Sequence, residues 1–521
     1  MRYFNILLLL LTGISLTASA QQENYKLLFH AVGPTENSVL GMYIQSIGDW
    51  DHDGYGDIYA CITMPELSGE YCRDYYGGEP MDTIPDLYFF EESSTLFGRA
   101  PSYSSSLNGD SYGDFTLEYN ISTDTSRINV YFGAELPDSI PDIVLPNEVG
   151  FLSAFGCFCC TCGDINGDGY DDFGTSDVSY SLGNPGEKGK IYIYYGGPSF
   201  DSIPDFTITS LPNEFGDLFG NPLSLDGDVD NDGYNDIFCL SLDSDLSEGG
   251  AYLFKGGVQL DSIPDWHIPY GYMGNYLGTD GGGIVKDLNG DGYDDIAIGW
   301  GGGYCLIFFG GERINTTPDL QLYTGTLYAN EIASAGDINN DGYGDIITTD
   351  FSLGIVRVYF GGDPMNASSD LLFYAASWEA GCAGDVNGDG VDDLMYFSQY
   401  VNGGSNGQIF IWGDTTLTSV NQPDVPANPA SFQLHQNYPN PFNACTGISF
   451  YVGKAGKYEL KIYNVQGRTV YSLRDEYHSG VSVHLTWDGR DLAGKVLSSG
   501  IYFLELSNGK DRQVKKMEIL R

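Results

Sequence analysis

Nine residues, Asp164–Asp172, are the part of this sequence best suited to hold a metal ion. Their sequence, DINGDGYDD, places oxygen-bearing side chains at its first, third, fifth and ninth positions. Hard cations such as Ca²⁺ take about six to eight oxygen ligands, and alternate residues of a tight loop can supply them at one point. Gly169, at the sixth position, allows the sharp turn that such a loop needs. The segment therefore predicts a calcium-binding loop, in which the main-chain carbonyl of Tyr170 is a further ligand.

The nine-residue pattern recurs along most of the chain. A degenerate copy, Ser106–Asp114, has Ser106 in place of the first aspartate and Ser111 in place of the glycine. A single copy would also suit a solvated acidic turn, but seven copies spaced by about 50–65 residues indicate a repeat architecture. Numbered in chain order, the degenerate copy is loop 2 and Asp164–Asp172 is loop 3. Loops 1, 4, 5, 6 and 7 are Asp49–Asp57, Asp228–Asp236, Asp287–Asp295, Asp337–Asp345 and Asp385–Asp393.

The six complete loops should each hold one structural Ca²⁺, whereas loop 2 should bind calcium weakly or remain empty. A catalytic ion needs an open coordination position, and four oxygen side chains with one carbonyl leave these loops largely occupied. The predicted ligands, with the seventh position acting through its carbonyl, are Asp49, Asp51, Asp53, Tyr55 and Asp57; Asp164, Asn166, Asp168, Tyr170 and Asp172; Asp228, Asp230, Asp232, Tyr234 and Asp236; Asp287, Asn289, Asp291, Tyr293 and Asp295; Asp337, Asn339, Asp341, Tyr343 and Asp345; and Asp385, Asn387, Asp389, Val391 and Asp393.

These loops differ from the calcium loop of an EF-hand. An EF-hand loop is longer, ends in a bidentate glutamate at its twelfth position and lies between helices. The twelfth position here is Ala60, Thr175 or Ile298 in three of the copies. The segments after the loops are short and apolar, which predicts strands. The loops are therefore expected to connect two strands.

Each repeat carries further signals at a regular distance from its loop. An apolar residue followed by glycine, as in Phe155-Gly156, precedes the loop in the first five repeats. An aromatic segment ending in glycine follows it, as in Ile191–Gly197, and a Pro-Asp turn such as Pro204-Asp205 usually comes next. These signals predict four strands per repeat, and a four-stranded sheet repeated radially is a propeller blade. The sequence therefore predicts an all-β fold with a seven-bladed β-propeller over residues 21–413.

The order of these motifs resembles the FG-GAP repeat family, the β-propellers of the integrin-α type. The resemblance covers about residues 24–413. It implies that the calcium loops lie on one face of the propeller and that a ligand binds the opposite face. The last repeat ends at Gly413 without a fourth strand, and Tyr25–His30 is a spare strand ahead of the first repeat. We predict that Tyr25–His30 completes the seventh blade, because this hides an exposed sheet edge.

The C-terminal part differs in composition from the repeats. Residues 414–430 are polar and contain three prolines, which indicates a linker. Residues 431–521 contain short alternating runs that predict a small immunoglobulin-like β-sandwich, at Ile448–Val452, Tyr458–Tyr463, Val481–Trp487 and Gly500–Leu506.

Short motifs in this C-terminal part resemble the C-terminal sorting domain of the bacterial type IX secretion system. They are Tyr438-Pro-Asn-Pro-Phe442, Ile462–Arg468, Thr486–Arg490, Ser499–Phe503 and the basic end Lys515–Arg521. The resemblance implies translocation across the outer membrane by the type IX secretion machinery. Release from the cell or anchoring at its surface would follow, often with removal of the sorting domain.

The N-terminus indicates an exported protein, and the net charge argues against nucleic acid and anionic membranes as partners. Residues 1–20 combine Arg2, the apolar run Ile6–Leu11 and the small-residue cleavage site Ala18–Ala20 of a secretory signal. The run is too short to span a bilayer, and we expect no transmembrane segment in the mature chain. The formal net charge is −48, from 71 acidic and 23 basic residues, and a surface so acidic repels nucleic acid and anionic membranes. We expect a secreted or outer-membrane surface-attached protein.

Cysteines offer little evidence for a second kind of site. Cys157, Cys159, Cys160 and Cys162 crowd into one segment, but side chains alternate along a strand, so all four cannot face one ion. We expect them to pack as small apolar residues. A disulfide such as Cys61–Cys72 would suit an exported protein, although sequence alone does not fix the pairing.

No motif of an enzyme stands out. The six histidines lack metalloprotease spacing, and neither a G-x-S-x-G nor a phosphate-binding loop occurs. His52 lies at a non-ligand position of loop 1, where we expect it to be exposed. We interpret the chain as a calcium-binding module for adhesion to a surface glycan or protein. The alternatives are an exported polysaccharide lyase or hydrolase built on the propeller, and a purely structural surface-layer component.

Overall fold

A computed structural model provides the structure of this protein. It describes residues 25–33, 39–64, 69–90, 96–97, 102–104, 107–122, 125–147, 155–178, 189–210, 218–242, 249–269, 277–301, 303–325, 331–373, 375, 377–398, 407–414, 432–434, 437, 442, 446–452, 454–477, 481–487, 489–491 and 494–520. These residues form strands and turns without a helix, as the sequence predicts. No helix of the described part has the length and hydrophobicity needed to cross a membrane. The predicted signal segment and most of the predicted linker lie outside the described residues.

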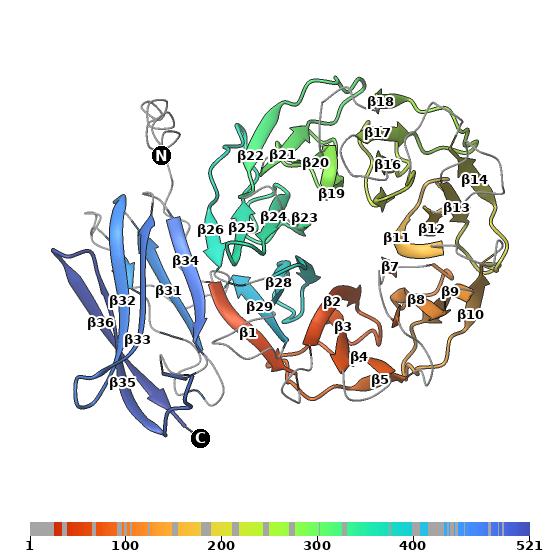
Figure 1. Cartoon of the computed structure of the whole chain (residues 1–521). Helices are drawn as coiled ribbons and strands as arrows, with labels where there is room; N and C mark the ends of the chain where they lie inside the picture. Colours follow the sequence, from red (N-terminus) through yellow and green to blue (C-terminus); the bar gives the residue numbers. More distant parts are fainter. Residues whose placement is uncertain are drawn as a thin grey trace.

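Seven antiparallel sheets stand in a ring to form the β-propeller (Figure 1), and sheet n is the sheet that contains the two strands joined by loop n. Sheet 1 contains β2 (Val39–Gly48), β3 (Asp57–Met64), β4 (Gly69–Tyr75) and β5 (Leu87–Phe90). Sheet 2 contains β6 (Leu96–Phe97), β7 (Ser102–Ser104), β8 (Asp114–Ser122), β9 (Thr125–Phe132) and β10 (Ile143–Pro146). Sheet 3 contains β11 (Phe155–Gly163), β12 (Asp172–Asp177), β13 (Lys190–Tyr194) and β14 (Phe206–Thr209).

The remaining sheets repeat this arrangement. Sheet 4 contains β15 (Leu223–Ser224), β16 (Ile237–Leu242), β17 (Gly249–Phe254) and β18 (Trp266–Ile268). Sheet 5 contains β19 (Leu277–Val285), β20 (Asp295–Trp300), β21 (Tyr304–Phe308) and β22 (Leu320–Tyr323). Sheet 6 contains β23 (Glu331–Gly336), β24 (Asp345–Asp350), β25 (Ile355–Tyr359) and β26 (Leu371–Phe373). Sheet 7 contains β27 (Ala380–Gly384), β28 (Asp393–Ser398), β29 (Gln408–Asp414) and β1 (Tyr25–Val32).

The burial of each strand follows its place in the ring. Strands β12, β16, β24 and β28, each second in its sheet, are buried at every position. A strand covered on both faces needs no polar face, and neighbouring sheets cover these strands. The rim strands alternate instead, as in Trp266 (buried), His267 (exposed) and Ile268 (buried) of β18. The hydrophobic core is thus divided into clusters between successive sheets.

The N-terminal strand closes the ring, as predicted. Strand β1 pairs antiparallel with β29, so that Tyr25 lies opposite Asp414 and Val32 opposite Gln408. Phe29 of β1 packs in one apolar cluster with residues of sheets 1 and 7, including Ile58 and Phe397. The first and last repeats are therefore joined by both hydrogen bonds and a shared core.

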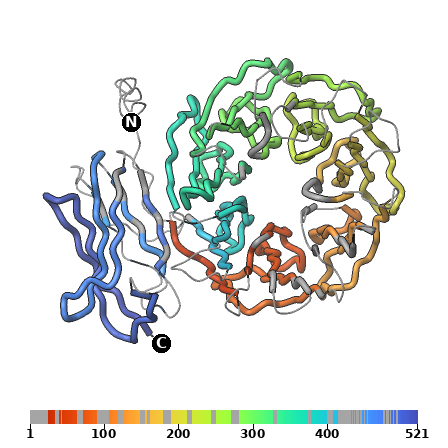
Figure 2. The backbone as a smooth tube through the Cα atoms, viewed as in Figure 1, coloured from red at the N-terminus to blue at the C-terminus, as the bar shows by residue number. Residues whose placement is uncertain are grey.

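The C-terminal unit lies beside the ring (Figure 2) and contains two facing groups of strands. One group contains β30 (Gln433–Leu434), β31 (Thr446–Val452) and β34 (Val481–Trp487). The other contains β32 (Gly456–Asn464), β33 (Thr469–Tyr477), β35 (Gly500–Ser507) and β36 (Arg512–Ile519). An apolar core that includes Ile448, Ile462 and Trp487 fills the space between them. Its immunoglobulin-like topology stays a prediction.

The two units share one sheet, which the sequence did not predict. Strand β26 of sheet 6 pairs in parallel with β34, and this pairing makes a seven-stranded sheet. Leu372 of β26 lies opposite Val483 and packs against the core of the C-terminal unit. The edge of sheet 6 is therefore covered by β34.

Candidate metal centres

The first aspartate of each complete loop closes the turn. Its Oδ1 accepts the main-chain N–H of position 5 at 2.8–3.2 Å. Its Oδ2 accepts the N–H of the glycine at position 6 at 2.7–3.0 Å. The two oxygens of one carboxylate thus bind the N–H groups of two consecutive residues, and this holds the loop in a tight coil. The third and fifth positions are thereby brought next to the first.

The side chains at positions 5 and 3 also accept hydrogen bonds from main-chain N–H groups of the loop. The Oδ1 atom of position 5 accepts the N–H of position 7 at 3.0–3.1 Å in all six complete loops. In loops 1, 3, 5 and 6 the side-chain oxygen of position 3 accepts the N–H of position 5 at 2.9–3.2 Å. These bonds fix the direction of each side chain and leave lone pairs for a cation.

Two positions of the loop adopt left-handed backbone conformations. The sixth-position glycine has a φ of 87–94° in the six complete loops, as predicted from sequence. The fourth position is also left-handed, and there it is occupied by glycine, asparagine or histidine. His52 is this residue in loop 1, with a φ of 59°, and its side chain is exposed as expected. The requirement at position 4 was missed in the sequence.

The ninth-position aspartate is buried at the base of the loop. Its Oδ2 accepts the N–H of position 2 at 2.8–3.1 Å in all seven loops. In sheets 1 to 6 its Oδ1 accepts the N–H of the glycine that ends the aromatic strand, at 2.8–3.0 Å. This aspartate therefore ties the loop to the third strand of its own sheet.

Burial at this position disfavours the charged carboxylate. It raises the pKa of Asp57 and Asp393 to about 8, and that of Asp172, Asp236 and Asp295 to about 7, although main-chain hydrogen bonds oppose the shift. A nearby cation favours the charged form of a carboxyl group. A cation that enters the loop should therefore lower the pKa of the ninth-position carboxyl group and favour loss of its proton.

Acidic oxygens converge most closely in loops 1 and 4. Asp49, Asp51 and Asp53 each have one carboxylate oxygen that lies within 4.8 Å of the corresponding oxygens of the other two residues. Those of Asp228, Asp230 and Asp236 satisfy the same limit. Loops 3, 5, 6 and 7 have an asparagine at position 3 and so have one carboxylate fewer among positions 1, 3, 5 and 9. Oxygen-only donor sets of this kind suit a hard cation, although coordination by the predicted ligands stays a prediction.

Successive loops are linked to one another around the ring. In loops 1, 2, 4, 5 and 6 the N–H of position 8 donates to the carbonyl of position 1 in the loop before it, at 2.7 Å from Gly344 to Asp287 and 3.1 Å from Gly113 to Asp49. Gly56 of loop 1 makes the same bond to Asp385 of loop 7, at 2.7 Å. The circle of loops is therefore continuous across the point where the chain begins and ends its circuit.

Aromatic rings reinforce these links. The tyrosine at position 7 of one loop lies over position 4 of the preceding loop, so that a Cβ atom added at Gly167 would overlap the ring of Tyr234. The same relationship joins Gly388 of loop 7 to Tyr55 of loop 1, where the added Cβ atom would lie 2.6 Å from the ring. At Gly167 and Gly388 glycine is therefore favoured by the left-handed backbone and required by the ring that covers the residue.

Loop 2 keeps part of this geometry. Asp114 accepts the N–H groups of Leu107 and Gly133 at 2.9 and 3.0 Å, and Asp110 accepts that of Tyr112 at 2.8 Å. Ser111, in place of the sixth-position glycine, is not left-handed. Ser106 lies outside the described residues. Weak or absent calcium binding by loop 2 stays a prediction.

The cysteines form a disulfide where the sequence allowed one. Cys61 and Cys72 are bonded across neighbouring strands of sheet 1. Cys162 is buried in an apolar cluster, as expected for a packing role. The side chains of Cys157, Cys159 and Cys160 lie outside the described part of the structure.

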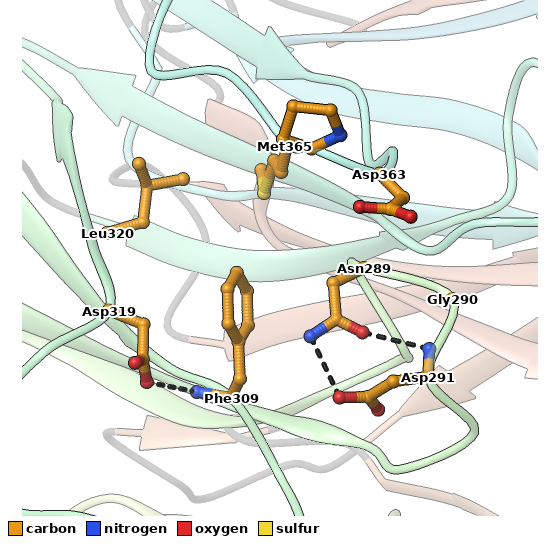
Figure 3. A pocket seen from close by; sticks show the side chains of 9 residues that line it. Asn289, Gly290, Asp291, Phe309, Asp319, Leu320, Asp363 and Met365 are labelled. Atoms are coloured by element: carbon orange, nitrogen blue, oxygen red, sulfur yellow. Dashed lines mark hydrogen bonds between the residues drawn. The ribbon is translucent and has the colours of Figure 1, made fainter.

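A cavity of about 430 Å³ borders loop 5 (Figure 3). Asn289 and Asp291 of the loop form one wall, where the Asn289 amide donates to Asp291 at 3.0 Å. Asp319, Asp363 and Met365 contribute to the rest of the lining. The nine lining residues include carboxylates but no histidine, lysine, arginine or cysteine. The cavity therefore extends the acidic surface of the loop, with Asp319 and Asp363 added to Asp291.

Comparison with known proteins agrees with both parts of this architecture. A family model described as "Secretion system C-terminal sorting domain" matches residues 436–520, and the FG-GAP repeat model matches residues 377–412. Integrin alpha-5 of Xenopus laevis is 30% identical over 187 residues, which cover 33% of this chain and 17% of that protein. Integrin alpha-PS5 of Drosophila melanogaster is 31% identical over 156 residues, covering 28% of this chain and 15% of that protein.

Two solved structures give weaker, fold-level matches. One is the Dos1 propeller, with 11% identity, a TM-score of 0.38, and coverage of 74% of this chain and 92% of that one. The other is PorZ of Porphyromonas gingivalis, described as a surface component of the type-IX secretion system. It has 12% identity and a TM-score of 0.33, and covers 91% of this chain and 60% of that one.

Proposed function

We propose that this chain, which carries an integrin-α-like FG-GAP propeller and a C-terminal type IX sorting domain, binds a surface glycan or protein and is stabilised by calcium. The sorting domain indicates type IX secretion to the cell surface or the extracellular space. The observation that carries the calcium proposal is the series of acidic loops linked by main-chain hydrogen bonds, which continues from loop 7 to loop 1 through Gly56 and Asp385. Extracellular calcium is concentrated enough to fill loops with affinities of about 10⁻⁴–10⁻³ M.

The donor chemistry fits calcium. The predicted ligand atoms of the turns are all oxygens, and the buried Oδ1 of Asp230 has no hydrogen-bond partner in the described structure. The six complete loops would each hold one ion through positions 1, 3, 5 and 9 and the carbonyl of position 7. A bound ion neutralises carboxylates that otherwise repel one another. Its role would be to brace the turn between two strands and, through the links between loops, the whole ring.

We propose a binding role in preference to a catalytic one. The loops fill one face of the ring with interlinked backbone, and the carboxylates that line the cavity beside loop 5 include Asp291, a predicted calcium ligand. The ligand would then bind the opposite face. Residues 179–188 and 211–217, which connect β12 to β13 and β14 to β15 along the chain, lie outside the described residues.

One experiment tests binding and catalysis together. The purified chain, with calcium, is passed over immobilised polysaccharides and surface glycoproteins, and both retention of the protein and the masses of the eluted ligand are measured. Retention without fragmentation of the ligand supports the binding proposal. New sugar ends would replace it with the polysaccharide-degrading alternative. Failure to retain the chain on any member of a broad panel would favour a purely structural component.

Calcium binding is measured separately. Equilibrium dialysis of the chain at increasing calcium concentration should give about six bound ions per chain at saturation, one for each complete loop. A chain with the first aspartate of loop 3 replaced, Asp164→Asn, should bind one ion fewer. The absence of bound calcium across the whole titration would contradict the proposal.

A further inference from the structure

Among the six complete loops, loop 4 differs because a lysine forms an ion pair with one of its predicted ligand carboxylates. Lys286 also lies near loop 5, 3.9 Å from Asp294, but Asp294 is not a predicted ligand. The ammonium group of Lys255, at the end of β17, forms an ion pair with Oδ2 of Asp230, the third position of the loop. The Asp230 side chain is 7% exposed and that of Lys255 is 37% exposed. The Asp230 carboxylate is therefore largely buried, and the Lys255 ammonium group contacts it from the solvent side.

In the equivalent strands of five other sheets, an aromatic residue occupies the position of Lys255. Its main-chain N–H donates to Asp265 at 2.9 Å, and the same bond is made in five other sheets by Tyr76, Phe132, Tyr195, Phe309 and Phe360, at 2.8–3.0 Å. The backbone at this position is therefore equivalent in six sheets. Among these six sheets only the side chain differs, and only in sheet 4 can it place a positive charge over the loop.

The lysine contact coincides with a change inside the loop. In loop 1 the third-position Asp51 accepts the N–H of Asp53 at 3.2 Å, and loops 3, 5 and 6 make the equivalent bond. In loop 4 the Oδ1 of Asp230 is buried without a hydrogen-bond partner among the described residues. Its other oxygen is paired with the ammonium group of Lys255. An unpaired buried oxygen is costly unless a donor or a cation completes it.

Loops 1 and 4 form a natural matched pair. Both have aspartate at positions 1, 3, 5 and 9, whereas the other complete loops have asparagine at position 3. Loop 4 has a lysine to offset its extra carboxylate, and loop 1 has Tyr76 at the same place. The two loops thus present the same oxygen donors with and without a positively charged side chain.

We propose that Lys255 is an internal counter-cation that competes with calcium for loop 4. An ion that enters the loop takes over Asp230 and displaces the ammonium group toward solvent. Loop 4 then fills at a higher calcium concentration than loop 1, and its filling exposes a positive charge on an otherwise acidic face. This inference rests on the proposed calcium binding and adds an order in which the sites fill.

Hydrogen exchange followed by mass spectrometry resolves the two loops in the full chain. Amide protection in peptides covering residues 49–57 and 228–236 is measured against free calcium concentration. Protection of loop 4 should appear at a calcium concentration about fivefold or more above that of loop 1, the ratio expected for losing a partly exposed ion pair. Lys255→Tyr should lower the midpoint of loop 4 to that of loop 1 and leave loop 1 unchanged.

The mirror substitution Tyr76→Lys provides the second arm. It should raise the midpoint of loop 1 by a similar factor, and Lys255→Met serves if the tyrosine variant does not fold. A midpoint of loop 4 that is unchanged or raised in both lysine variants, while the other loops fill normally, overturns the competition. If no loop gains protection and dialysis finds no bound calcium, the proposed calcium binding fails together with this inference.

Discussion

The hydroxyl of Tyr25 donates a hydrogen bond to the main-chain carbonyl of Ile338 at 2.9 Å, across 313 residues of sequence. Tyr25 begins β1, which completes sheet 7, and Ile338 is the second position of loop 6. The main-chain N–H of Ile338 in turn donates to Asp345 at 3.0 Å. The strand that closes the ring therefore also supports a candidate metal loop of the adjacent sheet.

Removal of residues 21–31 should abolish cooperative unfolding of the propeller. Without β1, strand β29 loses its partner and the cluster around Phe29 is opened to water. The measurement is the heat-induced transition followed by calorimetry. The milder variant Tyr25→Phe should unfold cooperatively and lose about 0.5–1.5 kcal/mol, because the ring is kept and one hydrogen bond is lost. A deletion variant with an unchanged transition would show that β1 is dispensable.

Asp74 should destabilise the fold. The substitution Asp74→Val should therefore raise the free energy of unfolding of the protein by about 1–3 kcal/mol. Asp74 is fully buried, and neither carboxylate oxygen has a hydrogen-bond partner in the described structure. Its main-chain carbonyl accepts the N–H of Asp86, and in five other sheets the equivalent residue is aliphatic: Val130, Ile193, Leu253, Ile307 and Val358. Denaturant unfolding measures the change. The mirror variant Val130→Asp should be destabilised in the same assay.

The gain from Asp74→Val should grow as the pH rises above about 4, the ordinary pKa of an aspartate. Burial, with the nearby Asp57 and Asp86, holds the pKa of Asp74 well above that value. The folded protein therefore keeps a proton that the unfolded chain releases, and the stability of the natural protein falls with rising pH in this interval. Equal stability differences at pH 4 and pH 8 would show that Asp74 ionises alike in both states.

Chelation of calcium should lower the melting temperature. A site filled at about 100 times its Kd contributes about 2.7 kcal/mol to the folded state, and emptying it leaves carboxylates such as Asp49 and Asp53 close together. Differential scanning calorimetry with calcium and with EDTA measures the difference. Magnesium added in place of calcium is the control, since it demands stricter octahedral geometry. Identical melts under all three conditions would argue against occupied loops.

Two glycines of loop 7 should respond differently to substitution by alanine. Gly388 and Gly390 both have left-handed backbones, with φ of 72° and 87°. A Cβ atom at Gly388 would be 2.6 Å from the ring of Tyr55, whereas one at Gly390 would have no neighbour within 4 Å. Gly390→Ala should therefore lose about 1–2 kcal/mol from backbone strain alone, and Gly388→Ala should lose more.

The double variant Gly388→Ala/Tyr55→Ala identifies the source of that extra loss. Removing the ring relieves the overlap, so the double variant should be more stable than the sum of the two single changes predicts. Denaturant unfolding of the four proteins gives the coupling. Strictly additive changes would mean that Tyr55 does not press on Gly388, and that loops 7 and 1 are joined through the hydrogen bond of Gly56 alone.

Features encoded within one short segment could be derived from the sequence. The spacing of Asp164, Asn166 and Asp168 and the glycine at position 6 define a turn through hydrogen bonds between residues no more than five positions apart. The four strands of each repeat follow from alternation and turn signals of the same short range. Ring closure by β1 was also predictable, because the last repeat lacked a strand that the N-terminus could supply.

The tertiary structure decided everything that depends on a neighbouring sheet. Gly167 and Gly388 must be small because Tyr234 and Tyr55, respectively, lie over them from the next repeat. Lys255 and Asp230 are 25 residues apart, and Asp74 is an ordinary strand residue until two sheets bury it. The pairing of β26 with β34 likewise joins two units with unrelated motifs. Sequence patterns record local hydrogen bonding, whereas such contacts arise only when the ring has closed.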